Sequence, residues 1–75
     1  MPHDDLDSLP AMISTRELAT FLRVSENLLM KWRSAGTGPP WVKVGGGTAG
    51  LVRYSRVDLR AYLAAQRRPA AAVTR

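Results

Sequence analysis

The stretch that decides the fold is ISTRELATFLRVSENLLMKW, residues 13–32. Apolar residues recur in it at the spacing of one helix face, first over Leu18–Leu22 and again over Leu28–Trp32. A serine stands before each run, Ser14 before the first and Ser25 before the second. Serine is a preferred N-cap because its hydroxyl accepts a bond from a free backbone N–H. The sequence therefore predicts two short helices joined by a tight turn.

The ends of both helices carry further signals. Ser14 and Glu17 have the spacing of a capping box, in which each side chain satisfies the other's backbone N–H. Gly36 is placed to end the second helix in the left-handed conformation. We therefore expect helices over about residues 15–22 and over Ser25–Ala35.

The following residues predict a hairpin and a third helix. Two segments of strand-forming residues, Trp41–Val44 and Leu51–Tyr54, flank the glycine-rich tip Gly45–Gly50. A further capping pattern at Ser55 opens a helix that runs to about Arg67. The predicted class is mainly α with a small β-hairpin. The order helix, turn, helix, hairpin, helix is that of a winged helix-turn-helix.

The chain of 75 residues is expected to form one small domain. We expect residues 1–11 to be a disordered acidic lead, residues 12–68 to be the winged domain, and residues 69–75 to be a disordered tail. A domain of this size has a thin core. Two aromatic residues, Trp32 and Tyr62, are expected to fill it. For Trp41 and Tyr54 the sequence leaves open whether they belong to the core or to a binding surface.

The charge of the chain is unevenly distributed. The net charge is +5 and the sequence pI is about 10.8. Three of the six acidic residues lie in the first eight positions, and the remainder of the chain has 11 basic and 3 acidic side chains, an excess of eight. Such an excess favours a polyanionic partner, and double-stranded DNA is the partner we expect. The alternative is a basic surface that only keeps the protein in solution.

Composition argues against several other classes. The chain has no cysteine and one histidine, His3, so we expect no metal and no cofactor. It has no apolar run of about 18 residues and its start does not resemble a signal peptide, so we expect no membrane partner. The acids Glu17, Glu26 and Asp58 all fall in first turns of predicted helices. Without a paired base or acid we expect no enzyme and no small-molecule ligand.

Candidate DNA-binding residues fall into three groups. In the second helix, exposed side chains that reach base edges or phosphates are expected from Ser25, Asn27, Met30, Lys31, Arg33 and Ser34. In the hairpin and its flanks, backbone approach and positive charge are expected from Lys43, Gly46, Gly47, Thr48, Arg53 and Arg56. In the first helix and the turn, phosphate contacts are expected from Thr15, Arg16 and Arg23. The alternatives are a capping role for Ser25, a plain flexible hairpin, and a generic helical hairpin.

Three pieces of the sequence resemble a known family. They are ISTRELATFLRVS, WRSAGTGPPWVKVG and VRYSRVDLRAYL, within Ile13–Leu63. The resemblance is to excisionase or recombination directionality factor domains, winged helix-turn-helix domains related to the DNA-binding head of MerR-like proteins. It implies that Ser25–Ala35 enters the major groove and that Gly45–Gly50 acts as the wing. The family often has several Arg or Thr residues at the start of the recognition helix, where this chain reads SENLLMKW.

The resemblance implies an accessory factor that binds DNA at adjacent sites, bends it and directs an integrase towards excision. Neighbouring copies of the chain and an integrase are then its expected partners besides DNA, and no dimerisation helix is expected after Arg67. A small MerR-like transcriptional regulator is the alternative, and a protein-interaction module is a third interpretation. We expect a cytoplasmic protein of a bacterium or phage, associated with the nucleoid.

Overall fold

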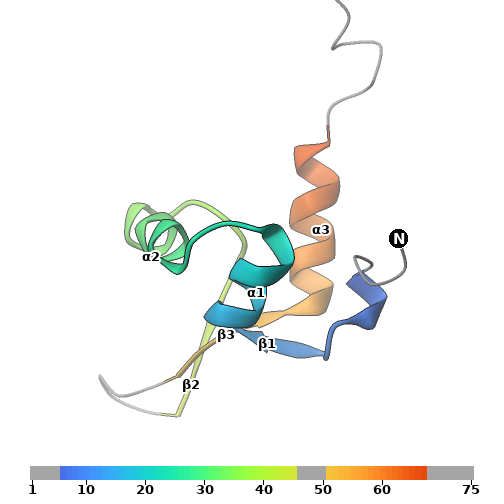
Figure 1. Ribbon diagram of the computed structural model, residues 1–75, viewed down its shortest axis with the longest axis horizontal. Helices are drawn as coiled ribbons and strands as arrows, with labels where there is room; N and C mark the ends of the chain where they lie inside the picture. Colours follow the sequence, from blue (N-terminus) through green and yellow to red (C-terminus); the bar gives the residue numbers. More distant parts are fainter. Residues whose placement is uncertain (1–5, 46–50, 68–75) are drawn as a thin grey trace, which may run out of the picture.

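The computed structural model describes residues 6–45 and 51–67, which form three α-helices and a short 3-10 helix around a small sheet (Figure 1). This arrangement confirms the predicted winged helix-turn-helix. The elements in chain order are the 3-10 helix η2 (Leu6–Ser8), β1 (Met12–Ser14), α1 (Thr15–Leu22), α2 (Glu26–Ala35), β2 (Val42–Val44), β3 (Leu51–Ser55) and α3 (Arg56–Gln66).

The caps predicted from the sequence hold the first two helices. At the start of α1, the Ser14 N–H donates to Glu17 Oε1 at 2.8 Å and the Glu17 N–H donates to Ser14 Oγ at 3.0 Å. The helix ends at Arg23, which has a φ of 61° and donates its N–H to carbonyls of the last turn. Ser25 Oγ then accepts from the Leu28 N–H at 3.0 Å, and Gly36 ends α2 with a φ of 75°. Local sequence therefore determines the boundaries of the helix pair.

The sheet has one strand more than the predicted hairpin. All its strands are antiparallel, in the order β1-β3-β2. The added strand is β1, in which Ile13 pairs with Tyr54. It is three residues long and its last residue, Ser14, is the helix cap, so its sequence shows the cap but no strand pattern.

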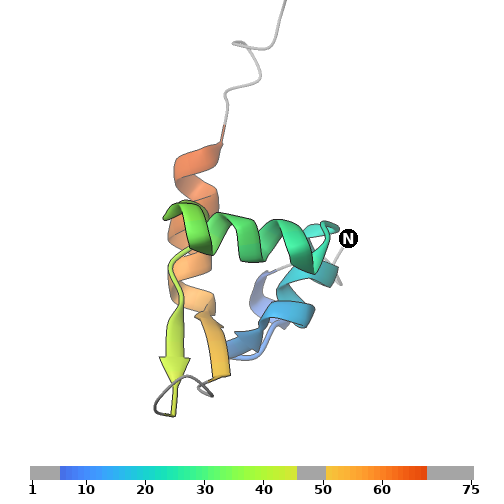
Figure 2. The same cartoon turned by 90° about the vertical axis from the view of Figure 1, so that its left-hand side faces the viewer.

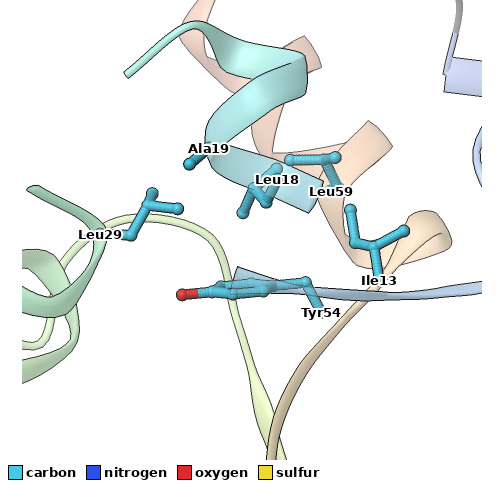
Figure 3. Packing of buried hydrophobic residues seen from close by; sticks show 6 residues of the cluster. All are labelled: Ile13, Leu18, Ala19, Leu29, Tyr54 and Leu59. Atoms are coloured by element: carbon cyan, nitrogen blue, oxygen red, sulfur yellow. The ribbon is translucent and has the colours of Figure 1, made fainter. Parts of the chain in front are cut away.

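The core lies where the helices meet β1 and β3 (Figure 3). It contains one or two buried side chains from each of these elements: Ile13, Leu18, Ala19, Leu29, Tyr54 and Leu59. Trp32 packs against this cluster and is half-buried, and Tyr62 is also half-buried. Tyr54, which the sequence left open, is only 1% exposed. Its ring lies below Leu18 and its hydroxyl points towards α2.

The expectation of disorder before residue 12 is wrong for residues 6–11. Leu6–Ser8 form η2, and Leu6 and Leu9 pack against the core. The guanidinium of Arg56 in α3 donates to the Leu9 carbonyl at 2.6 Å and to the Asp7 carbonyl at 3.3 Å. Arg60 pairs with the Asp7 carboxylate. The segment is ordered because α3 supplies these donors from the far end of the sequence. Residues 1–5 and 69–75 lie outside the described residues.

Candidate nucleic-acid interface

Helix α2 presents one open face. Leu29 is fully buried and Trp32 is half-buried on its inner side. The opposite side is exposed at Asn27, Met30, Lys31 and Ser34, as predicted from the helical period. Figure 2 shows α2 lying across the outside of the molecule, in front of the other helices. This exposure is what a helix that enters a groove requires.

Two shallow depressions on this side join α2 to the sheet. The first is lined by Asn27, Met30, Lys31, Ser34 and Ala35, and the second by Met30, Arg33, Ser34, Trp41, Lys43 and Val52. Both contain Met30 and Ser34, so they form one continuous surface. We call it the α2–wing surface. No acidic side chain lines it in the part of the chain that the structure describes, and its cations are Lys31, Lys43 and Arg33. The tip residues Gly46, Gly47 and Thr48 lie outside the described residues.

The two basic residues of the hairpin lie on opposite faces of the sheet. Lys43 pairs with Val52, which shares a sheet face with Tyr54 and thus faces α2. Arg53 alternates to the other face, between Ser14 and Val42 in the neighbouring strands, and donates to the Val52 carbonyl at 2.8 Å. The structure therefore brings Lys43 to the α2–wing surface and leaves Arg53 behind it.

Arg33 is turned inwards from α2. Its Nη1 donates to Tyr54 Oη at 2.8 Å and to Thr15 Oγ1 at 3.3 Å. Its Cζ lies 5.8 Å from the centroid of the Trp41 ring, within the range of a cation–π contact. Arg33 and Thr15 were both predicted to contact DNA, but in the structure Arg33 donates to Thr15 and to the buried Tyr54. The sequence could not show this, because the three residues meet only in the folded chain.

The remaining predicted residues are spread over the molecule. Ser25 has the capping role that was the alternative interpretation, because its oxygen accepts from α2. Arg16 and Arg23 are exposed at the two ends of α1. Arg56 holds the N-terminal segment, on the side of the molecule away from α2 (Figure 1). The structure therefore brings Asn27, Met30, Lys31, Ser34 and Lys43 together and places Arg56 elsewhere.

One residue of the surface was missed. Trp41 is 40% exposed and lines the second depression. The signal was present in the sequence, since Trp41 stands at the start of a predicted strand and follows two prolines, whose own φ angles are fixed. Sequence alone did not say on which side of the strand the ring lies.

Other classes of site have no support in the described residues. No group of three His, Cys, Asp or Glu residues there could hold a metal ion. None of the described helices has the length and apolar character needed to cross a membrane.

Comparison with known families gives one match. The model of a family described as a helix-turn-helix domain matches residues 12–67. The match begins with β1 and ends just after α3. Comparisons with curated proteins and with solved structures find no match.

Proposed function

The chain belongs to this family of excisionase-type helix-turn-helix domains, and from that premise we propose that it is an accessory factor of site-specific recombination. Such a factor binds DNA, bends it and directs an integrase towards excision, while the chemistry belongs to the integrase. The observation that carries the proposal is the family match over residues 12–67, which includes the helix pair, the hairpin and α3.

The α2–wing surface supplies the contacts. We place α2 in the major groove, where the amide of Asn27 can bond an adenine edge and Lys31 can reach a guanine edge or a phosphate. Lys43 then follows the phosphates towards the neighbouring minor groove. The lack of acidic side chains in the described lining of this surface supports the assignment, because a carboxylate there would repel the backbone.

Several copies are expected to act together. Among the described residues of the α2–wing surface, the cations that no partner holds within the protein are Lys31 and Lys43. This surface of one copy therefore makes few ionic contacts, whereas bending a site of 20–30 base pairs costs about 1–6 kcal/mol. Neighbouring copies on adjacent sites can share that cost. We therefore propose cooperative binding and a bend that grows with the number of bound copies.

The test is a footprint on the DNA that flanks the protein's own gene, combined with gel-based measurement of bending. We expect adjacent protected sites that fill over a narrow concentration range, a bend in the occupied DNA, and excision by the neighbouring integrase only when the protein is present. A single isolated half-site bound tightly by one copy, without bending, contradicts the proposal. Protection confined to a promoter, with no effect on excision, supports a transcriptional regulator instead.

A salt titration separates DNA binding from a protein-interaction role. The logarithm of the affinity for DNA is expected to fall linearly with the logarithm of salt concentration, with a slope of about −0.9 per phosphate contacted. A response that is flat in salt contradicts every DNA-binding interpretation.

A further inference from the structure

The α2–wing surface has an apolar patch, formed by Met30 and Trp41, that has no part in the DNA contacts proposed above. Met30 is 45% exposed and Trp41 is 40% exposed, and both line the depression between α2 and the hairpin strands. Lys43 and Ser34 line the same depression. Large exposed apolar side chains next to a cation suit a ligand that is itself part apolar and part anionic.

Trp41 is held in place from within the protein. The guanidinium of Arg33 lies 5.8 Å from the ring centroid, and Arg33 is fixed in turn by Tyr54 Oη and Thr15 Oγ1. Pro39, two residues before Trp41, is buried. An exposed indole that is already oriented loses little conformational entropy when a ligand covers it. Arg33 is thus a positioning residue for this ring.

The position of the patch identifies its occupant. It lies between α2, which we have placed in the major groove, and the hairpin, whose Lys43 we have placed on the phosphates towards the neighbouring minor groove. In that arrangement the sugar-phosphate strand that separates the two grooves crosses this depression. A deoxyribose is apolar over its C–H surface and has a phosphate on either side, so it matches an apolar floor beside a lysine and a hydroxyl.

We propose that the depression seats one sugar-phosphate step of DNA, with the deoxyribose against Trp41 and Met30 and the phosphates at Lys43 and Ser34. The proposal rests on the DNA-binding function above and adds a contact that does not depend on base sequence. It separates the binding free energy of this surface into an ionic part, from Lys43, and an apolar part, from Trp41 and Met30.

The salt dependence of DNA affinity tests this division into an ionic and an apolar part. The probe is a duplex that the wild-type chain selects from a random pool. Trp41→Ala is expected to lower affinity roughly tenfold at every salt concentration, so that the plot of log affinity against log salt shifts in parallel. Lys43→Ala is expected to make the slope shallower by about 0.9. Trp41→Phe keeps an aromatic ring and is expected to restore most of the affinity.

Leu51→Ala is the matched control. Leu51 is 57% exposed in the hairpin, but it lies on the sheet face opposite to Lys43. We expect its affinity for DNA to equal that of the wild type. Thermal unfolding of each variant identifies any loss that comes from the fold.

Hydroxyl-radical footprinting locates the contact, because the radicals attack exposed deoxyribose. Met30→Ala/Trp41→Ala is expected to lose protection of one or two sugars on the strand between the grooves and to keep the rest of the footprint. This inference is overturned if the double variant keeps the full sugar protection and binds DNA as tightly as the Leu51→Ala control. That outcome leaves DNA binding itself intact. Failure of the wild-type chain to select any duplex overturns the proposed function itself.

Discussion

The sheet face that turns towards the helices is buried at one end and open at the other. At the β1–β3 end, Ile13 is fully buried and Tyr54 is 1% exposed. Further along the same face, Val52 is half-buried and Lys43 is exposed. One face of one sheet thus provides both part of the core and part of the α2–wing surface. Substitutions at the first end are therefore expected to change stability, and those at the second end are expected to change binding.

Tyr54→Ala is expected to have the largest effect. It removes one of the largest buried side chains of a thin core, and such truncations cost about 3–5 kcal/mol of the free energy of unfolding. Urea unfolding followed by circular dichroism measures the loss. If the alanine variant does not fold, Tyr54→Phe removes only the hydroxyl that accepts from Arg33, with an expected loss of about 1–2 kcal/mol. No loss in either variant would falsify the assignment of this end of the sheet to the core.

The connection from α2 to β2 leads from the core to the hairpin, and its packing can be tested with a pair of glycines. Gly38 has a φ of 83°, and a Cβ added there would lie 2.8 Å from Trp32 Cε3. Gly38→Ala therefore combines a strained backbone with overpacking, and we expect a loss of about 2–4 kcal/mol in the free energy of unfolding. Gly36 has a φ of 75° but a Cβ there meets no atom within 4 Å. Gly36→Ala is expected to lose only about 1 kcal/mol.

Thermal melts of the two glycine variants, side by side, check this difference. Equal losses would mean that the packing of Gly38 against Trp32 does not matter. In that case the connection from α2 to β2 is not held against the core at this point.

At the open end, Lys31→Ala is expected to weaken DNA binding and leave the fold intact. Lys31 is exposed on the α2–wing surface, so the free energy of unfolding should change by less than about 0.5 kcal/mol. Removing a base-reading side chain from a helix in the major groove costs about 1–3 kcal/mol of binding and relaxes the sequence preference at that position. Gel shifts on the selected duplex and on single-base variants of it measure both effects.

Arg60→Ala is the control for Lys31→Ala, because it removes the same charge from α3, where Arg60 pairs with Asp7. Equal losses of DNA affinity in the two variants would show that only net charge matters, and α2 would then not be the reading helix.

The sequence predicted the elements that local chemistry determines. Serine caps, a left-handed glycine and the helical period place α1 and α2 without reference to the rest of the chain. It missed β1, because three residues beside a cap form a strand only through their pairing with β3. It also missed the docking of residues 6–11, which depends on donors from α3.

The candidate site also has parts that the sequence predicts and parts that depend on the folded chain. The exposed face of α2 follows from periodicity, so Asn27, Met30 and Lys31 could be predicted. The separation of Lys43 from Arg53 follows from the register of β2 and β3, which a glycine-rich connection does not reveal. The inward turn of Arg33 depends on a tyrosine hydroxyl that is distant in sequence. Periodicity therefore shows which residues share a face, and tertiary packing decides which of their charges stay free.

The smallest expected effect is that of the exposed ion pair between Asp7 and Arg60. The two side chains are 79% and 53% exposed, so solvent screens their attraction. Asp7→Asn is expected to lower the free energy of unfolding by about 0.2–1 kcal/mol at roughly 0.1 M salt and by less at roughly 1 M salt. Urea unfolding at the two salt concentrations measures the difference. A loss above about 2 kcal/mol that persists in high salt would contradict a surface pair. It would mean that Asp7 fixes the whole segment of residues 6–11, and that the apolar side chains of this segment contribute to the stability of the buried end.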